Sequence, residues 1–117
     1  MVEVRRVDQA IARWGARFLE RVFTPHEQAQ CAGRCQSLAA RFAAKEAAAK
    51  ALGTGIGIVS WREVEILSDQ RGKPHLHLHG NASLIAARQG LQQWAVSLSH
   101  SREYAIATVV ASTASGP

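Results

Sequence analysis

The sequence lacks the long apolar runs that mark membrane proteins. No stretch reaches the roughly 18 consecutive apolar residues that a transmembrane helix needs. The N-terminal residues MVEVRRVDQA contain no apolar segment of the kind found in a signal peptide. We therefore expect a cytoplasmic protein that does not bind a membrane.

Cysteine is also scarce. Cys31 and Cys35 lie four residues apart, and no second Cys/His pair stands at a spacing typical of a zinc site. A metal or redox pair is one interpretation of the two cysteines. Two reduced, partly buried thiols are the interpretation that the spacing favours.

Acidic residues are outnumbered, with 9 Asp and Glu against 14 Lys and Arg, and the formal net charge is +5. A basic surface favours an acidic partner, such as nucleic acid, anionic lipid, a phosphorylated ligand or an acidic protein. The sequence has no helix-turn-helix, RNP motif or zinc-finger spacing. Its 3 tryptophans are not interleaved with arginines as a base-stacking platform requires. These absences count against nucleic acid.

The chain of 117 residues is long enough for one domain with a single modest core, and we expect one domain over 1–117. The small polar residues at 112–117 are typical of a disordered tail. Four strands are expected in the second half of the chain, at 64–67, 74–79, 93–99 and 104–112. The first two read as a hairpin around a turn at 69–72, and Asn81 is a candidate cap for a short helix at 82–89.

The stretch 37–55, SLAARFAAKEAAAKALGTG, reads as one helix rich in alanine. Ser37 is a candidate N-cap, and Gly53 suits the left-handed position after the last turn. Glu46 and Lys50 lie four residues apart on one face of this helix. A solvated surface ion pair is the ordinary interpretation of such a spacing. The glycines after the helix do not form a Walker loop, because no Gly-Lys-Ser/Thr follows them.

Residues 4–22 predict the first helix, with an apolar stripe of Val7, Ile11, Trp14 and Phe18 and a bend at Gly15. Arg6, Arg13 and Arg17 occupy a different face of this helix, which a solvated surface would also explain. Thr24, Pro25 and Glu27 then form a capping box that opens a second, short helix.

Three histidines, His75, His77 and His79, alternate along one expected strand and so share a face. Such a row could bind a metal. A solvent-facing side, opposite Leu76 and Leu78 in the core, is the interpretation we favour.

The ordered string RFAAKEAAAKALGTG, at 41–55, closely resembles the signature of the 4′-phosphopantetheinyl transferases, and in particular of the small bacterial holo-acyl-carrier-protein synthases. Segments at 18–27, 60–66, 71–74 and 96–110 resemble the same family in order and spacing. The resemblance implies an α+β fold in which helices pack on one side of an antiparallel sheet. It also implies a homotrimer with active sites between subunits.

The resemblance further implies a reaction. Similar enzymes transfer phosphopantetheine from coenzyme A to a serine of apo acyl carrier protein, an acidic partner, and release 3′,5′-ADP with the help of Mg²⁺. Glu46 matches the family's metal-binding glutamate. Lys50 matches the lysine that contacts the diphosphate and is a candidate to protonate the leaving group. Both are candidate catalytic residues.

The resemblance assigns further candidate contacts. The basic residues of the motif, Arg41 and Lys45, are expected to help hold coenzyme A phosphates, and Gly53 lies in a loose phosphate cradle. A turn with Gly72, Lys73 and Pro74 is expected to border the adenine. Ser99 and His100 match a pair near the diphosphate, although a histidine after a strand is often structural. Similar enzymes grip the carrier protein with first-helix arginines, here Arg6, Arg13 and Arg17.

The start of the sequence departs from the family pattern. Members normally begin with a strand of the form Gly-x-Gly-x-Asp, whose aspartate binds the metal together with the motif glutamate. Met1 to Val4 match only the residues after that aspartate, and Asp8 falls on the first helix, past the matching position. A shortened start or a natural variant with weakened metal binding would each explain this. Two hypotheses from the resemblance therefore stand, the active transferase and an impaired relative that only binds coenzyme A or carrier protein.

Overall fold

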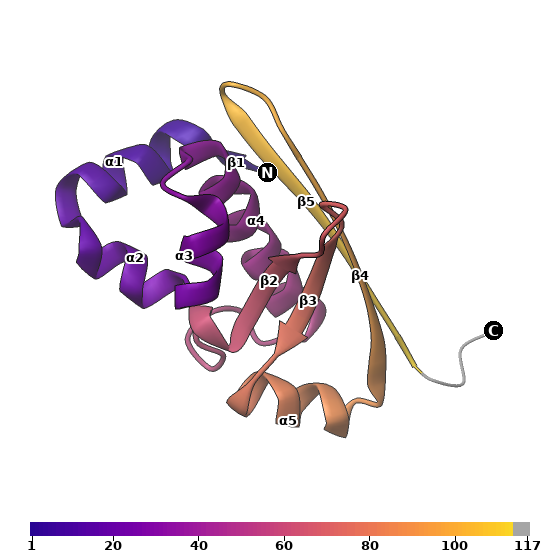
Figure 1. Cartoon of the computed structure of the whole chain (residues 1–117). Helices are drawn as coiled ribbons and strands as arrows, with labels where there is room; N and C mark the ends of the chain where they lie inside the picture. Colours follow the sequence, from indigo (N-terminus) through magenta and orange to yellow (C-terminus); the bar gives the residue numbers. More distant parts are fainter. Residues whose placement is uncertain (114–117) are drawn as a thin grey trace.

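The computed structural model describes residues 1–113 and shows helices packed on antiparallel strands (Figure 1). Its elements in chain order are β1 (Val2–Glu3), α1 (Val4–Trp14), α2 (Ala16–Val22), α3 (Pro25–Cys31), α4 (Cys35–Ala51), the 3-10 turn η1 (Trp61–Glu63), β2 (Val64–Ser68), β3 (Pro74–Leu78), α5 (Gly80–Arg88), β4 (Leu91–His100) and β5 (Tyr104–Thr113). The expected α+β class is confirmed. No helix within 1–113 has the length and apolar content to cross a membrane.

The strands form two separate sheets. One has the order β1-β5-β4 and the other is the β2-β3 hairpin, and all pairings are antiparallel. The expected hairpin and the last two strands are therefore confirmed. The tail needs a correction, because Ser112 and Thr113 pair with Gln93 and Leu91 and so belong to β5. The rest of the expected tail, 114–117, lies outside the described residues.

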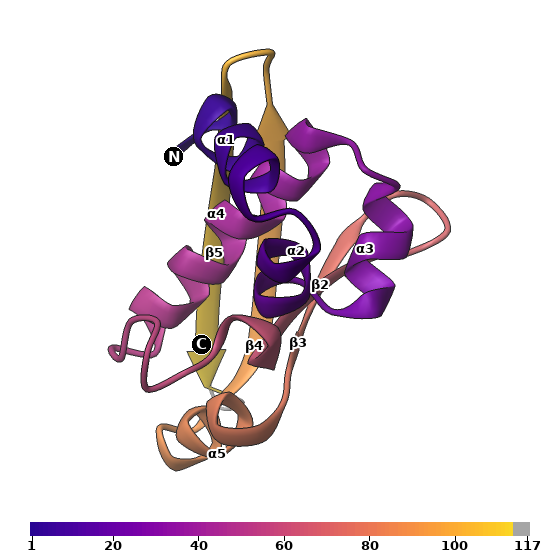
Figure 2. The same ribbon diagram turned by 90° about the vertical axis from the view of Figure 1, so that its left-hand side faces the viewer.

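Helix α4 runs along the β4–β5 ribbon, and α1, α2 and α3 lie on the same side of that ribbon (Figures 1 and 2). Most residues of α4 are buried, because apolar or small side chains occupy nearly every face of this helix. One core cluster lies between α4 and the N-terminal elements, around Phe23 and Leu38. A second lies between α4, the hairpin, α5 and the long ribbon, around Leu52 and Ile66. The central helix thus joins both halves of the core.

The two ends of α4 test the expected caps differently. The helix begins at Cys35, and its N-cap is Arg34 without a side-chain cap, so the assignment of Ser37 as N-cap is wrong. Ser37 lies inside the first turn, where its Oγ accepts from Arg34 Nε at 3.5 Å. At the other end Leu52 is the C-cap, and Gly53 follows with φ 79°. The expected glycine stop is confirmed.

Gly15 breaks the first helix rather than bending it. Its backbone has φ 57° and ψ −132°, so α1 ends at Trp14 and α2 begins at Ala16. Val7 is buried, and Ile11 and Phe18 pack against the same core cluster as predicted. Trp14 departs from the expected stripe, because the break turns it outward and leaves it 50% exposed.

Of the two other expected caps, one is confirmed. Thr24 and Glu27 form the capping box of α3, with Pro25 in the first turn. Asn81 is not a cap, because α5 already begins at Gly80 after His79. The Asn81 amide group instead donates to the carbonyl oxygen of Ile58 at 3.0 Å.

Two of the three histidines in the row pair with carboxylates, and His77 is exposed on β3 without such a partner within 1–113. His75 Nε2 lies 2.9 Å from Asp69 Oδ2, and His79 Nε2 lies 2.9 Å from Glu65 Oε1. On the opposite face of β3, Leu76 and Leu78 pack against the second core cluster, as expected. Both cysteines are free thiols, Cys31 buried and Cys35 partly buried, which confirms the favoured interpretation.

Candidate active site

Helix α4 presents Glu46 and Lys50 on one face, one helical turn apart. Glu46 is half-buried and Lys50 is exposed. Neither side chain makes a hydrogen bond or an ion pair with any other residue of 1–113. The two are therefore not joined as a surface ion pair. A carboxylate and an ammonium group stay open to a ligand on this face.

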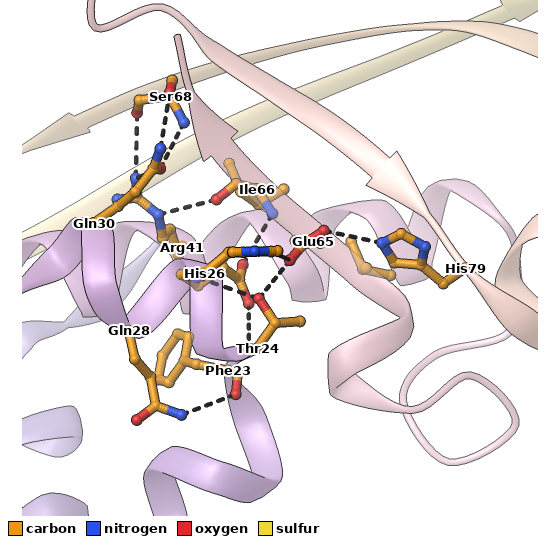
Figure 3. A network of polar contacts seen from close by, with 12 residues as sticks. Phe23, Thr24, His26, Gln28, Gln30, Arg41, Glu65, Ile66, Ser68 and His79 are labelled. Carbon is orange, nitrogen blue, oxygen red and sulfur yellow. Dashed lines mark hydrogen bonds and ion pairs between the residues drawn. The ribbon is translucent and has the colours of Figure 1, made fainter. Parts of the chain in front are cut away.

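Arg41, expected to hold coenzyme A phosphates, is buried and bound to the protein itself (Figure 3). Its Nε donates to the carbonyl oxygen of Ile66 at 3.1 Å. Its Nη2 donates to Gln30 Oε1 at 3.1 Å and to Ser68 Oγ at 3.2 Å. The guanidinium joins α4 to α3 and β2 through Nε and Nη2, so Arg41 makes internal contacts, and the phosphate contact expected of it stays a prediction.

For Lys45 the expected phosphate contact is corrected, since this side chain is fully buried. Its Nζ donates to Glu27 Oε1 at 2.7 Å, to Trp61 O at 3.0 Å and to Val64 O at 2.5 Å. A lysine has three donors, and all are used. Burial lowers the pKa of Lys45, while the charge of Glu27 and its hydrogen bond act in the opposite direction. A phosphate would find no donor left on this side chain.

Gly53 follows Leu52, the C-cap of α4, and its backbone amide is not free. It donates to Lys50 O at 2.9 Å, and the next two amides, of Thr54 and Gly55, both donate to Ala49 O at 3.2 Å. The loose phosphate cradle is therefore not formed by these amides. What Gly53 offers is space, because a Cβ built there would meet nothing within 4 Å.

The turn after β2 places Lys73 and Pro74 at the tip of the hairpin. Lys73 is exposed and Pro74 is half-buried. The Asp69 carboxylate accepts from the amides of Arg71 and Lys73 at 2.9 and 3.0 Å, and Gly72 adopts φ 85°. The turn is thus held by the Asp69 side chain, and the Lys73 side chain has no hydrogen-bond or ion-pair partner within 1–113.

Ser99 and His100 end β4 and are both exposed. His100 lines an open cavity of about 850 Å³ between the β4–β5 loop and the first turns of α1 and α4. Three arginines share that cavity, namely Arg5, Arg34 and Arg102. The acidic groups of Glu3, Asp8 and Glu103 also line it, so its charge is mixed.

Within one chain, His100 lies far from Glu46 and Lys50. Cys35, at the start of α4, lines the same cavity as His100, whereas Glu46 lies 11 residues further along the helix. At 1.5 Å per residue this is about 16 Å along the axis, and Lys50 lies still further away. A ligand the size of one phosphate cannot touch both groups within one copy. The implied placement of active sites between subunits is compatible with this separation.

The three arginines expected to bind the carrier protein, Arg6, Arg13 and Arg17, are all exposed on α1 and α2. Arg13 lies over the ring of Trp14, 5.0 Å from its centroid. Arg17 lines a groove of about 680 Å³ whose other main lining residues are Trp14, Phe18, Arg21, Phe42 and Trp61. Arg6 lines a smaller hollow that shares Phe18 and Phe42 with this groove. The arginines therefore surround an aromatic floor.

Sequence reasoning missed this aromatic floor. Phe42 and Trp61 stack with ring centroids 4.5 Å apart, and Phe18 and Phe42 lie 6.4 Å apart. Phe42 stands one turn before Glu46 on α4, so the groove begins beside the candidate catalytic face. The four-residue spacing of Phe42 and Glu46 was the only available signal, because the contact with Trp61 depends on the fold.

Comparison with known proteins identifies the class. Two crystal structures of holo-acyl-carrier-protein synthases superpose closely on the chain. The one from Helicobacter pylori, in complex with coenzyme A, has a TM-score of 0.87 and 33% identity, with 95% of each chain covered. The one from Neisseria meningitidis has a TM-score of 0.86 and 38% identity, covering 96% of this chain and 93% of that one.

The sequence relatives agree. A holo-acyl-carrier-protein synthase of Herpetosiphon aurantiacus is 53% identical over 117 aligned residues, which cover 94% of this chain and 92% of the relative. The model of the 4′-phosphopantetheinyl transferase superfamily matches residues 1–109. The chain belongs to this superfamily.

Proposed function

We propose that the chain transfers 4′-phosphopantetheine from coenzyme A to a serine of an apo acyl carrier protein and releases 3′,5′-ADP. The observation that carries the proposal is the contrast along α4. Lys45 is buried with all three of its donors used, and Arg41 is buried and bound to α3 and β2, whereas Glu46 and Lys50 have no partner within 1–113 and share one accessible face. Charged side chains without internal partners, inside a family motif, are the groups that a substrate can use.

The transfer forms one bond and breaks one. The serine oxygen bonds to the β-phosphorus of coenzyme A, and the bond from that phosphorus to the oxygen of 3′,5′-ADP breaks. The serine proton passes to a base, either a carboxylate or a water molecule. The Lys50 ammonium offsets the charge that develops on the leaving phosphate and is placed to donate a proton to it.

Glu46 fits a Mg²⁺ site as one ligand. Its carboxylate is an oxygen donor of the kind that Mg²⁺ prefers, and it is unpaired within 1–113. No group of three or more possible ligand side chains exists among the described residues, so substrate phosphates and water would complete the shell. When bound, the ion would offset the charge of the diphosphate and orient it.

We further propose that three copies assemble and share each site. The strands β4 and β5 carry no Lys, Arg, Asp or Glu, and Ile106 and Val110 are 46% and 58% exposed on β5. An uncharged sheet face with exposed aliphatic side chains favours burial against another copy. Ser99 and His100 at the end of β4 would then lie against the Glu46 face of a neighbouring copy.

The acidic carrier protein would dock on the arginines around the aromatic groove. Arg13 and Arg17 are exposed and make no ion pair within 1–113, which leaves their charges available. The groove begins one helical turn from Glu46. A partner held there would bring its serine close to the catalytic face. The two free cysteines fit a reducing compartment, and we place the reaction in the cytoplasm.

The test is the intact mass of an apo acyl carrier protein after incubation with the chain, coenzyme A and Mg²⁺. We expect the carrier to gain the mass of phosphopantetheine, and Glu46→Gln to abolish the gain while the circular dichroism spectrum stays unchanged. Arg88→Met on α5 is the matched control, because Arg88 is exposed and is not one of the candidate site residues. A chain that binds coenzyme A but leaves the carrier mass unchanged would instead be the impaired relative.

A further inference from the structure

The outer edge of β2 is bound by side chains instead of by another strand. Strand β2 pairs with β3 on one side only. On its other side, Lys45 Nζ donates to Val64 O at 2.5 Å, and the Ile66 amide donates to Glu27 Oε2 at 2.9 Å. The Ile66 carbonyl accepts from Arg41 Nε at 3.1 Å. Charged groups from α3 and α4 thus take the place of a neighbouring strand.

The outer edge of β2 has its most complete set of side-chain hydrogen bonds at Ser68, the last residue of the strand. Gln30 Oε1 accepts from the Ser68 amide at 2.8 Å, and Gln30 Nε2 donates to the Ser68 carbonyl at 2.9 Å. Arg41 Nη2 donates to both Gln30 Oε1 and Ser68 Oγ. Gln30 therefore binds Ser68 as a paired strand residue would, and Arg41 fixes both partners (Figure 3).

Ser68 is the last residue before the tip of the hairpin. It pairs with Pro74 across the ladder, and Asp69 next to it organises the turn that carries Lys73. The hairpin shares no backbone ladder with the β1-β5-β4 sheet within 1–113. Lys45 and Glu27 tie the earlier part of β2 to the helices, and next to the turn this connection is made by the contacts of Arg41 and Gln30 at Ser68.

We propose that Arg41 and Gln30 are positioning residues for coenzyme A. They hold the turn of Lys73 and Pro74 at a fixed place relative to the Glu46 face of α4, without touching the ligand themselves. This inference rests on the proposed function, because it takes the turn as the part that meets the adenine side of coenzyme A. In this proposal Arg41 acts on the hairpin turn and does not bind a phosphate of coenzyme A.

The test compares Arg41→Met, Gln30→Ala and the control Arg88→Met by two measurements. Hydrogen exchange of the unliganded protein reports the amides of Arg71, Gly72 and Lys73, all of which are bonded to Asp69. Calorimetric titration with 3′,5′-ADP reports the affinity for the adenine end of the substrate. We expect Arg41→Met and Gln30→Ala both to exchange faster in the turn and both to bind 3′,5′-ADP more weakly, Arg41→Met by about tenfold. The control should change neither quantity.

Gln30→Ala separates positioning from direct contact. This substitution removes no charge, and Gln30 is an exposed residue. The Gln30→Ala protein should therefore fold even where Arg41→Met does not. A direct phosphate contact by Arg41 predicts weaker binding in Arg41→Met alone, with no change in turn exchange, and that result would overturn the proposal. Faster exchange with unchanged affinity would overturn it as well.

A failure of the proposed function would look different. A parent chain that binds no 3′,5′-ADP would overturn the coenzyme A role itself. The hydrogen-exchange rates of the turn amides in Arg41→Met would still decide whether Arg41 and Gln30 hold the turn through Ser68. In the transfer assay, Arg41→Met and Gln30→Ala should raise KM for coenzyme A and leave KM for the carrier protein unchanged. General damage to the fold would change both KM values.

Discussion

Lys45 Nζ lies 2.7 Å from Glu27 Oε1, and both side chains are fully buried. The two residues come from different helices, α4 and α3, and each also binds the backbone of β2. The same glutamate closes the capping box of α3. One buried ion pair therefore joins a helix start, the central helix and the hairpin.

Breaking this pair from one side should be costly. Lys45→Met leaves Glu27 as a buried charge without its cation, and we expect the free energy of unfolding to fall by about 3–5 kcal/mol. Glu27→Gln should cost a similar amount, whereas the double variant should lose clearly less than the sum. Urea denaturation of all four proteins measures this coupling. Additive losses would mean that the two charges do not stabilise each other.

If the arginines of α1 and α2 bind the carrier protein, changing them should affect KM for the carrier protein but not KM for coenzyme A. Reversing Arg13 and Arg17 to Glu should raise KM for the carrier protein and flatten its dependence on salt, because charge complementarity acts on encounter and register. KM for coenzyme A should stay unchanged. Arg88→Glu, on the exposed surface of α5, is the matched charge reversal and should have no effect. An equal rise of both KM values in the arginine variants would point to damage elsewhere.

The short strand β1 predicts a dependence on Mg²⁺. Val2 pairs with Ala105, so residues placed before Val2 in the same direction would pair with β5 from Ile106 onward. We expect the unextended chain to need high Mg²⁺, because Glu46 is its only identified ligand. Adding a strand that ends in Gly-x-Asp directly before Val2 should lower that requirement.

Replacing the added Asp by Ala controls this experiment. The gain in Mg²⁺ affinity should vanish, while any gain in thermal stability from the extra strand should remain. The measurement is transfer rate against Mg²⁺ concentration for the three proteins. Saturation of the unextended chain at the same Mg²⁺ as the extended form would show that a second ligand already exists.

The hairpin turn predicts a response to acid. The hydrogen bond from His75 lowers the pKa of Asp69 below its ordinary value of 3.8, and the amides of Lys73 and Arg71 lower it further. A carboxylate with a lowered pKa in the folded state supports the turn fully above pH 3.8. That support is lost as the pH falls through the folded-state pKa.

An NMR titration of the Asp69 carboxyl group tests this relationship. His75→Ala should raise its pKa toward 3.8, whereas His77→Ala should not, because His77 shares the exposed face without pairing with Asp69. The same pKa in both variants would show that the backbone amides alone hold the carboxylate.

Local signals in the sequence predict much of the fold. The alternation of the strands, the stop at Gly53 and the capping box at Thr24 each depend on neighbouring residues, and all three are confirmed. The errors at Ser37 and Asn81 have one cause. Each is a good cap by residue type, but the helix begins one or more residues earlier, where no side-chain cap is made.

The candidate site was predictable only in part. Glu46 and Lys50 lie on one face of α4, as their spacing indicates, but they do not form the surface ion pair that such a spacing ordinarily suggests. The pattern could not show that Lys45 turns inward, because its partner Glu27 lies 18 residues away and reaches it only in the folded chain. Residues with the same charge in one motif can thus serve a ligand or the core, and burial decides between them.

Sharing of each site between copies is the central claim, and mixing two inactive variants tests it most directly. Glu46→Gln removes the proposed metal ligand from one copy, and His100→Ala removes the proposed phosphate contact from another. The two proteins are refolded together in equal amounts, and phosphopantetheine transfer to the carrier is measured by mass. Random assembly should restore about one quarter of the parent rate, because a site with both intact residues forms only between different chains. A mixture no more active than the separate variants would contradict a shared site.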